Sequence, residues 1–338
     1  MTTKKLLYIG NKLSKHGNTT TVIETLGLSL SIEGYQVVYA SDKKNQIVRL
    51  LDMIVVTLFN LSKVDYVIID TYSTFSFNYA LIISQICRLF HKKYIPILHG
   101  GNLPNRLENS KFLSQLVFKN AYTNVAPSQY LRTAFATKGY DNVIFIPNTI
   151  EINNYQFLER EFIEPKLLWV RSLAKLYNPK MAIQVTSKLQ SVFPNVQLCM
   201  VGPDKENLLQ ECQQFAQKLK VNVVFTGKLS KEDWVELSKK YNVFINTTHF
   251  DNTPVSVIEA MALGLPIVST NVGGIPFLIK DKQEALLISD NDSEEMYCAV
   301  KELFENTDLR KTIVLNARKK AETFDWEHVK QKWVEILK

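Results

Sequence analysis

The sequence contains, between residues 250 and 266, the stretch Phe250-Asp251-Asn252-Thr253-Pro254-Val255-Ser256-Val257-Ile258-Glu259-Ala260-Met261-Ala262-Leu263-Gly264-Leu265-Pro266. Thr253 is a preferred N-cap residue, and Pro254 suits the first helical position. Gly264 suits the left-handed residue that follows a helix, and Pro266 prevents continuation. The stretch therefore predicts a helix of about ten residues that begins directly after a strand.

The N-terminus of this helix is a candidate anion site. Its unpaired backbone N–H groups and the positive end of its dipole both attract negative charge. Asp251, in the turn before the helix, can accept hydrogen bonds from sugar hydroxyls, and Glu259 can accept a second pair from a ribose. The residue types alone fit a turn aspartate and a solvated helix glutamate equally well.

Outward from this stretch, short β-branched runs alternate with segments of helical period along the chain. This alternation predicts an α/β fold with parallel sheets and crossover helices. The expected strands are Lys5–Ile9, Gln36–Ala40, Tyr66–Asp70, Tyr94–Leu98, Asn124–Ala126, Val143–Ile146, Lys166–Val170, Gln197–Val201, Asn222–Thr226, Val243–Thr247 and Ile267–Ser269. The expected helices are Thr20–Ile32, Phe77–Phe90, Ser110–Lys119, Gln129–Thr137, Pro179–Ser191, Lys205–Leu219, Lys231–Lys239, Pro254–Leu263, Ser293–Glu305, Leu309–Glu322 and Trp326–Leu337.

The chain length and one irregular stretch predict two domains. A length of 338 residues exceeds one typical domain and fits two of about 150–180 residues. The regular alternation stops near Pro147 and resumes at Lys166. We expect an N-terminal Rossmann-like domain at residues 1–150, a C-terminal one at 151–323 and a terminal helix at 324–338. A cleft between two such domains is a favoured place for a ligand.

The net charge of +7 is concentrated in the first half. Residues 1–150 carry 16 Lys and Arg against 8 Asp and Glu, whereas residues 151–338 carry 24 against 25. Such a field attracts an anionic membrane surface, an anionic lipid-linked acceptor or nucleic acid. A solvated basic surface without a specific partner is the alternative.

Cysteine placement and hydropathy bear on where the chain works. Four scattered cysteines without Cys-x-x-Cys spacing predict neither a metal site nor a disulfide framework. No apolar run approaches the ~20 residues of a membrane span, and the first strand is too short for a signal peptide. We expect a cytoplasmic protein, at most peripheral at the inner face of the plasma membrane.

Residues 250–276, which end in Gly273-Gly274-Ile275-Pro276, resemble the donor-site signature of the retaining glycosyltransferases of family 4. That family has the GT-B fold, in which two Rossmann-like domains face one another across a cleft. The family has two glutamates separated by seven residues, the first at the transferred sugar and the second at the nucleotide ribose. Glu259 matches the second, and Asp251 occupies the first position with a side chain one methylene shorter. Phe277 stands where the family often has an acidic residue.

Other positions extend the resemblance along the chain. Arg171 and Lys175 match the family's cations at the donor diphosphate, with Lys180 as an alternative to Lys175. His99 matches a strand-end histidine near the reacting centre. The loop from Gly10 to Gly17 resembles the family's first glycine-containing loop. The stretch Phe324-Asp325-Trp326-Glu327 resembles the start of a terminal helix that crosses back to the first domain.

The remaining donor contacts implied by the resemblance lie on loops of the second half. Gly202 and Gly227 belong to two glycine turns that follow strands. The second turn lies near the nucleobase in this family, so Thr226 and Lys228 are candidate contacts. Further donor-binding candidates at the helix start are Asn252, Thr253, Pro254 and Val255.

The resemblance implies transfer of a hexose from a nucleotide diphosphate donor, uridine-linked, to a hydroxyl of a glycan or lipid-linked acceptor, with retention and by a front-face mechanism. The role expected is bacterial surface polysaccharide assembly, such as capsule or lipopolysaccharide. No Asp-x-Asp motif lies within the donor signature at residues 250–276, so we expect no required metal, no cofactor and no nucleic-acid partner. A GT-B nucleotide-sugar epimerase and a noncatalytic nucleotide-sugar-binding module stay open as alternatives. Gly-x-Gly-x-x-Gly is absent, which gives a dinucleotide dehydrogenase little support.

Overall fold

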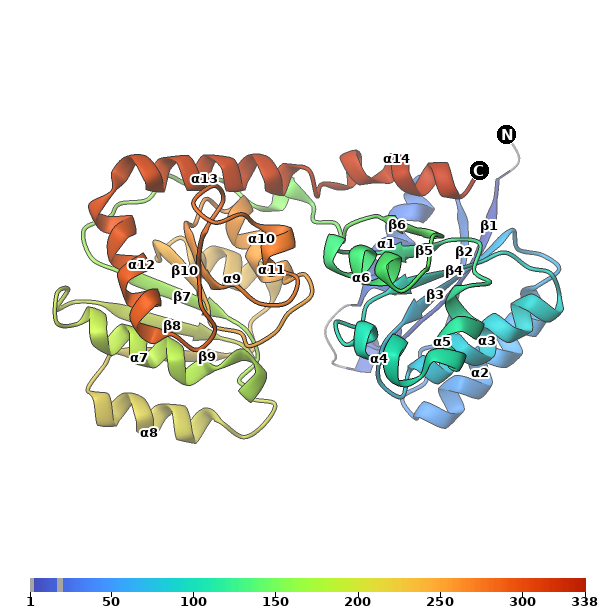
Figure 1. Ribbon diagram of the computed structural model, residues 1–338, viewed down its shortest axis with the longest axis horizontal. Coiled ribbons are helices and arrows are strands. Elements are labelled where there is room, and N and C mark those ends of the chain that lie inside the picture. The colour runs from blue at the N-terminus through green and yellow to red at the C-terminus, as the bar shows by residue number, and fades with distance from the viewer. Residues whose placement is uncertain (1–2, 17–20) are drawn as a thin grey trace. The chain divides into compact units, whose positions relative to one another are not determined.

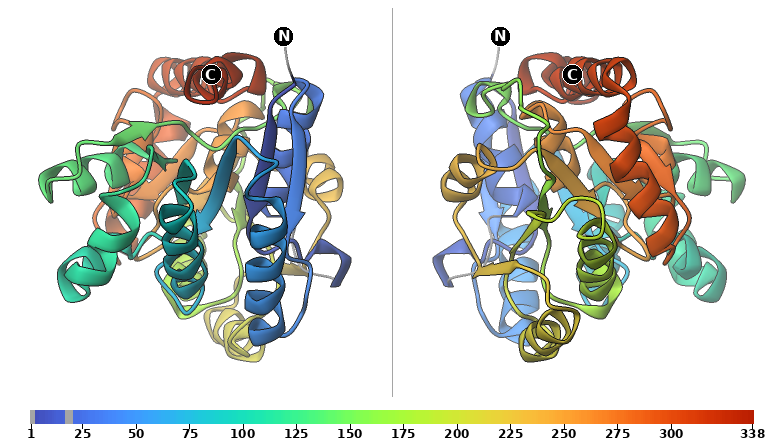
Figure 2. Two further views of the ribbon diagram at one scale, coloured as in Figure 1. Left: turned by 90° about the vertical axis from the view of Figure 1, so that its right-hand side faces the viewer. Right: turned by 90° about the vertical axis from the view of Figure 1, so that its left-hand side faces the viewer.

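The computed structural model describes residues 3–16 and 21–338, which form two compact units. Unit 1 comprises Met1–Thr149 and Trp326–Lys338, and unit 2 comprises Ile150–Asp325. Each unit has a six-stranded parallel sheet with helices on both faces (Figures 1 and 2). The α/β fold predicted from the alternating sequence pattern is therefore confirmed.

The sheet of unit 1 has the strand order β2-β1-β3-β4-β5-β6. Its inner strands are buried on both faces, which explains their continuous apolar runs, whereas the two edge strands are partly exposed. The strands are β1 (Lys5–Ile9), β2 (Gln36–Ala40), β3 (Tyr66–Thr71), β4 (Tyr94–Leu98), β5 (Asn124–Ala126) and β6 (Val143–Phe145). The 3-10 turn η1 (Ser14–His16) follows β1.

Helices from distant parts of the sequence cover the two faces of this sheet. Leu6 and Tyr8 of β1 face a core that includes Trp333, whereas Leu7 and Ile9 face the other core. The first face is covered by α1 (Val22–Ile32) and α14 (Trp326–Ile336). The second face is covered by α2 (Gln46–Asn60), α3 (Phe77–Leu89), α4 (Leu103–Asn109), α5 (Lys111–Phe118) and α6 (Gln129–Thr137).

Helix α2 is missing from the sequence-based prediction. Its buried side carries Met53 and Thr57, but apolar residues also cover its exposed side, so the pattern lacks the polar face of an amphipathic helix. The Asn45 side chain caps the helix by accepting hydrogen bonds from the backbone N–H groups of Ile47 and Val48. Across residues 3–16 and 21–338, no helix combines the length and the hydropathy needed to cross a membrane.

The sheet of unit 2 has the strand order β12-β11-β10-β7-β8-β9. Its strands are β7 (Lys166–Val170), β8 (Gln197–Val201), β9 (Val223–Gly227), β10 (Val243–Asn246), β11 (Ile267–Thr270) and β12 (Leu286–Ile288). One face is covered by α7 (Pro179–Leu189), α8 (Leu209–Leu219) and α12 (Ser293–Glu305). The other face is covered by α9 (Lys231–Ser238), α10 (Val255–Ala262), α11 (Ile275–Leu278) and α13 (Thr307–Glu322). Two 3-10 turns, η2 (Ile152–Asn154) and η3 (Lys175–Tyr177), complete the unit.

Both sheets contain a topological switch point, where neighbouring strands lead into connections that run in opposite directions. In unit 1 it lies between β1 and β3, and in unit 2 between β7 and β10. The loops at the carboxyl ends of such a strand pair diverge, and the crevice between them is where doubly wound folds bind ligands. The loop after β7 begins at Arg171, and the loop after β10 contains Asp251.

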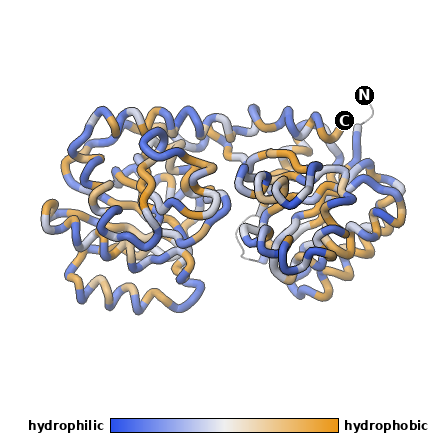
Figure 3. Tube along the Cα trace, in the orientation of Figure 1, coloured by the Kyte–Doolittle hydropathy of each residue, from blue (hydrophilic) through white to orange (hydrophobic). Residues whose placement is uncertain are grey.

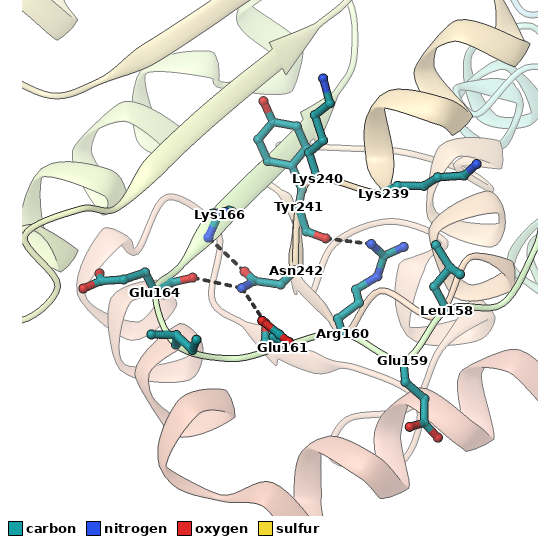
Figure 4. A pocket seen from close by; sticks show the side chains of 11 residues that line it. Leu158, Glu159, Arg160, Glu161, Glu164, Lys166, Lys239, Lys240, Tyr241 and Asn242 are labelled. Carbon is teal, nitrogen blue, oxygen red and sulfur yellow. Dashed lines mark hydrogen bonds between the residues drawn. The ribbon is translucent and has the colours of Figure 1, made fainter.

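The segment of unit 2 that precedes β7 is anchored at the amino ends of the strands, at the other end of the sheet from the switch-point loops (Figure 4). Arg160 donates hydrogen bonds to the backbone carbonyls of Ser238, Tyr241 and Leu263 at 2.7–3.0 Å, and its burial lowers its pKa to about 10. A hollow of about 500 Å³ lies beside it, where β7 and β10 begin. Doubly wound folds bind ligands at the carboxyl ends of their strands, whereas this hollow lies at the amino ends. We therefore assign its residues a structural role.

Candidate functional site

The switch point of unit 2 brings two predicted site residues into direct contact. Arg171 Nη2 donates to Asp251 Oδ2 at 2.6 Å, and the two side chains are 15% and 16% exposed. They come from the loops after β7 and β10, which are neighbouring strands in the sheet (Figure 1). The Arg171 guanidinium also lies over the Tyr177 ring, 5.2 Å from its centroid. A cation and a carboxylate are therefore held together, with water access, at the edge where ligands bind.

Glycines fix the backbone around this pair. Gly202 has a φ of +147°, and an added Cβ there would lie 1.9 Å from the carbonyl oxygen of Arg171. A Cβ on Gly273 would lie 2.3 Å from the carbonyl oxygen of Asp251, and one on Gly274 would lie 1.8 Å from that of Asn252. No side chain fits at these distances, so the Gly-Gly turn supports the aspartate loop from beneath by close backbone packing.

The turn η3 is hydrogen-bonded to the segment that leads into Asp251. The Thr247 hydroxyl donates to the carbonyl of Tyr177 at 2.8 Å. The backbone N–H of His249 donates to the carbonyl of Leu176, also at 2.8 Å. These bonds join the loops after β7 and β10 into one structure.

The two candidate lysines for the diphosphate differ in their surroundings. Lys175 lies in η3, its backbone N–H donates to Glu206, and its exposed ammonium forms no ion pair within the described ranges. Lys180 lies on α7, and its ammonium pairs with Glu211 of α8 at 2.6 Å. The turn with Lys175 is bonded to the aspartate loop, whereas Lys180 is directed to a neighbouring helix.

The predicted start of helix α10 needs a correction. The N-cap residue is Pro254, in an extended conformation, and the helix begins at Val255 rather than at Pro254. Thr253, the expected N-cap, makes no capping hydrogen bond. Pro254 accepts the first helical bonds through its carbonyl, from Val257 and Ile258. Gly264 has the predicted left-handed conformation after the helix, with a φ of +74°.

Glu259 is buried in α10 and holds two hydrogen-bonding partners. Its Oε1 accepts from the Tyr155 hydroxyl at 2.7 Å and from the Lys231 ammonium at 2.9 Å. Burial, followed by the charge of Glu259, raises the pKa of Tyr155 well above its usual range, so its hydroxyl is a donor at all physiological pH values. The carboxylate is thus fixed in position from two sides.

The remaining predicted donor contacts lie along β9 and the loops beside it. The backbone N–H of Gly202 donates to the carbonyl of Gly227 at 2.9 Å, which joins the two glycine turns. Gly227 has a φ of +70°, and the Thr226 hydroxyl donates to its carbonyl. Gly227 and Lys228 are exposed at the carboxyl end of the sheet.

In unit 1 the predicted His99 belongs to a buried cluster at the end of β4. Its Nε2 lies 2.9 Å from Asp70 Oδ1, and the side chains are 6% and 0% exposed. The Tyr8 hydroxyl donates to the same oxygen at 3.0 Å, and the Tyr72 ring stacks on the imidazole at 5.3 Å between centroids. Burial and the Asp70 charge raise the pKa of both tyrosines.

The glycine loop of unit 1 is described only in part. A Cβ on Gly10 would lie 2.5 Å from Asp70 Oδ2, so only glycine lets the chain pass over this carboxylate. Gly17 lies outside the described residues. The structure therefore places Gly10 and His99 around a single carboxylate.

Buried polar atoms without hydrogen bonds gather at the switch point of unit 2. Among the described residues these are Arg171 Nε, Asn246 Oδ1, Thr253 Oγ1 and Ser256 Oγ. Buried polar groups in native proteins are nearly always paired. Two of these atoms lie on the switch-point loops, one at the end of β10 and one in the first turn of α10, so a polar ligand bound there has buried partners available.

Sequence reasoning missed the partners of the candidate residues. Tyr155 lies within the irregular stretch between Pro147 and Lys166, and Lys231 is one of many surface lysines, so neither carried a signal. Asp70 did carry one, because a carboxylate within an entirely buried strand is rare and usually has a function.

Residues 156–320 match the family described as glycosyl transferases group 1. Unit 2 is a glycosyl transferases group 1 domain. An uncharacterized glycosyltransferase of Methanocaldococcus jannaschii is 26% identical over 309 residues, which cover 82% of this chain and 76% of that protein. The resemblance found in the sequence is confirmed at the level of this family.

Solved structures of other proteins share the fold of this chain. Sucrose-phosphate synthase from Thermosynechococcus elongatus is similar with a TM-score of 0.82 and 14% identity, over 98% of each chain. Anabaena HepE in complex with UDP and glucose is similar with a TM-score of 0.77 and 19% identity, over 99% of each chain. The predicted GT-B fold is confirmed by these likenesses.

Proposed function

We propose that this chain transfers a hexose from a uridine diphosphate sugar to a hydroxyl of a glycan or lipid-linked acceptor, with retention, as a family 4 enzyme. The observation that carries the proposal is the Arg171–Asp251 pair at the switch point of unit 2, beside four unpaired buried polar atoms. A uridine-linked donor is supported by the likeness to HepE, which was crystallised with UDP and glucose.

The leaving diphosphate gains charge during the reaction. The bond between the sugar C1 and the phosphate oxygen breaks, its electron pair stays on the diphosphate, and the acceptor oxygen bonds to C1 from the same face. The acceptor proton leaves with the diphosphate. Arg171, Lys175 and the open N–H groups at the start of α10 would stabilise the developing charge.

Donor binding would exchange the partners of the switch-point pair. A diphosphate is a stronger acceptor for Arg171 than one carboxylate, because it presents more negative charge to the guanidinium. Asp251, released from Arg171, can then accept hydrogen bonds from sugar hydroxyls. Asp251, which is one methylene shorter than the glutamate of the family, would thus pair with Arg171 in the free chain and with the sugar hydroxyls in the donor complex from the same backbone position.

The nucleoside would be held by Glu259 and by the glycine turns. The position of the Glu259 carboxylate is fixed by Tyr155 and Lys231, so it can accept ribose hydroxyls without reorganisation. Thr226, Gly227 and Lys228 would border the base. The open space at Gly227, where an added Cβ would meet nothing within 4 Å, permits a close approach of the nucleotide to the backbone.

His99 would contact the sugar or the reacting centre from unit 1. Its Nε2 is committed to Asp70, and Tyr72 restrains the ring, so Nδ1 is the atom left for a substrate hydroxyl. The fixed cations at the donor site supply the charge stabilisation that a metal supplies in other transferases, so we expect transfer without added metal.

The acceptor proposal rests on the charge of unit 1 and on the family resemblance. A basic surface favours an acceptor at an anionic membrane, such as a lipid-linked glycan in bacterial capsule or lipopolysaccharide assembly. We therefore place the chain in the cytoplasm, peripheral to the inner face of the plasma membrane.

The test is turnover. The purified chain is incubated with a panel of nucleotide sugars and glycan or lipid-linked acceptors, without metal, and released nucleoside diphosphate is measured for wild type and Asp251→Ala. We expect release from one uridine-linked donor that depends on acceptor and is lost in the variant. Binding of a donor without release by any acceptor would instead favour a binding module, and interconversion of the donor alone would favour an epimerase.

A further inference from the structure

Helix α2 exposes a continuous row of apolar side chains. Six of its residues are between 48% and 72% exposed, namely Ile47, Val48, Leu51, Val55, Leu58 and Phe59. Their spacing of three, four and seven residues places them on one side of the helix. Figure 3 shows the trace of α2 on the outside of unit 1 with hydrophobic residues along it. We call this row the α2 face.

The α2 face is the side of the helix that does not pack on its own unit. The opposite side is buried through Arg49, Met53 and Thr57 and contributes to the core beneath the sheet. Leaving this much apolar surface in water is unfavourable, and monomeric proteins rarely retain a large contiguous patch without a partner.

Helix α3 extends the α2 face at its C-terminal end. The two helices pack against each other, and the Lys92 ammonium donates to the carbonyl of Val64, just beyond α2, at 2.7 Å. This contact places the end of α3 beside the end of α2. Leu89 and Phe90 are 74% and 55% exposed there.

The part of the chain that carries the α2 face has a net positive charge. Residues 42–141, which include every helix on that side of the sheet, contain twelve Lys and Arg and six Asp and Glu, a net charge of +6. One residue of each sign, Arg49 and Asp70, is buried, and Asp52 is the acidic residue on α2 itself. Lys43 and Lys44 precede α2 and Lys63 follows it, so lysines stand at both ends of the apolar row.

We infer that the α2 face docks on an anionic lipid bilayer, with its apolar side chains at the boundary between headgroups and acyl chains and its lysines at the headgroups. The apolar row matches the hydrocarbon boundary of such a membrane, and the flanking lysines match its anionic headgroups. A second copy of the same basic surface would be repelled. Nucleic acid would match the lysines but would leave the apolar row in water.

The inference is tested by vesicle co-sedimentation of the full chain, in the absence of any sugar donor. Vesicles are made of phosphatidylcholine alone or with about a third replaced by phosphatidylglycerol. We expect binding to the anionic vesicles that weakens by about tenfold when salt is raised from ~0.05 to ~0.5 M, because screening removes the electrostatic part. The inference rests on the membrane location given in the proposed function, but because no transfer is measured, failure to bind vesicles and failure to transfer sugar are separate outcomes.

Two matched double variants distinguish vesicle binding through the α2 face from nonspecific binding through any exposed apolar residues. Leu51→Gln with Phe59→Gln is expected to lower the partition coefficient by about tenfold or more. Leu28→Gln with Ile32→Gln, on the exposed side of α1 on the opposite face of the same sheet, is expected to leave it within about twofold. Unchanged unfolding midpoints show that these exposed substitutions keep the fold.

A positive readout reports insertion directly. In Phe59→Trp, the new indole is expected to show a blue-shifted emission with anionic vesicles and to be quenched by brominated acyl chains. Three results would overturn the inference: no binding to anionic vesicles, equal loss in both double variants, or self-association of the chain that is abolished by Leu51→Gln with Phe59→Gln.

Discussion

The pair Arg171–Asp251 in unit 2 and the pair His99–Asp70 in unit 1 both lie at the carboxyl edges of parallel sheets, yet they are built differently. The first has side chains about one-sixth exposed and few other partners. The second is almost fully buried, with Tyr8 bonded to its carboxylate and Tyr72 stacked on its imidazole. An exposed pair can exchange one member for a ligand, whereas a buried pair holds a side chain in one orientation. We therefore assign binding of charge to unit 2 and positioning to unit 1.

The largest expected effect comes from breaking the exchangeable pair. Arg171→Ala removes the main fixed cation at the leaving diphosphate and leaves Asp251 to repel it, so we expect kcat/KM to fall by about a thousandfold. The measurement is nucleoside diphosphate release at several donor concentrations.

Lys180→Ala is the matched control for this prediction, because Lys180 is a cation of the same unit that pairs with another helix. It is expected to change kcat/KM by less than about threefold. Equal losses in both variants would show that general surface charge, rather than the pair, supports the reaction.

The backbone beneath the pair gives the next effect. Gly202→Ala places a Cβ against the carbonyl of Arg171 at a φ of +147°, so we expect the free energy of unfolding to fall by about 3 kcal/mol. Gly139→Ala, also at positive φ but with open space around it, should cost only about 1 kcal/mol. Chemical denaturation measures both, and equal costs would contradict the role of close packing at Gly202.

Asp70→Asn tests the buried pair. An amide cannot hold His99 with the same charge and orientation, so we expect kcat to fall by about thirtyfold while the donor KM changes by less than about threefold. Asp65→Asn, at an exposed carboxylate on the turn before β3, is the control. If Asp70→Asn lowers the free energy of unfolding but leaves kcat unchanged, Asp70 has only a structural role.

The smallest effect is expected at Tyr155. Tyr155→Phe removes one donor to Glu259, and we expect UDP binding to weaken by about fivefold. The raised pKa of Tyr155 means that the folded chain keeps the phenol proton at a pH where the unfolded chain loses it. Its contribution to stability is complete below pH ~10 and is lost as pH rises further.

Denaturation curves between pH 9 and 11 check the same residue. Above pH ~10 the stability of wild type should fall more steeply than that of Tyr155→Phe, by about 1.4 kcal/mol per pH unit. Parallel curves would mean that the hydroxyl of Tyr155 titrates normally in the folded chain.

Much of the fold could be predicted because strands buried on both faces give unmistakable apolar runs. The inner strands β1, β4, β5, β7 and β8 have the predicted bounds, as does the half-exposed edge strand β2. Helix α2 was missed because its apolar residues face outward as well as inward, a pattern that a core-facing helix does not produce. Helix α8 begins at Leu209 rather than Lys205, because the Asp204 side chain accepts the backbone N–H groups of Leu208 and Leu209 in a turn before it.

In the candidate site, residues that are contiguous in sequence could be predicted together, whereas contacts between distant residues could not. The unit 2 motif is contiguous in sequence, so the loop, the helix and the Gly-Gly turn were visible together. Tyr155 reaches Glu259 from 104 positions away, and Asp70 reaches His99 from 29, so only the folded chain reveals these contacts. Thr253 was misplaced as a cap because the extended Pro254 takes that position itself.

We propose that Arg171 binds the donor diphosphate by exchanging Asp251 for it. Calorimetric titration of the full chain with UDP, for wild type, Arg171→Ala and Asp251→Ala, distinguishes this exchange from binding that does not involve the pair. We expect Arg171→Ala to weaken UDP binding by about a hundredfold, whereas Asp251→Ala should bind UDP at least as tightly as wild type because its arginine is already free. UDP affinity that is unchanged in Arg171→Ala, or lost in Asp251→Ala, would contradict the exchange.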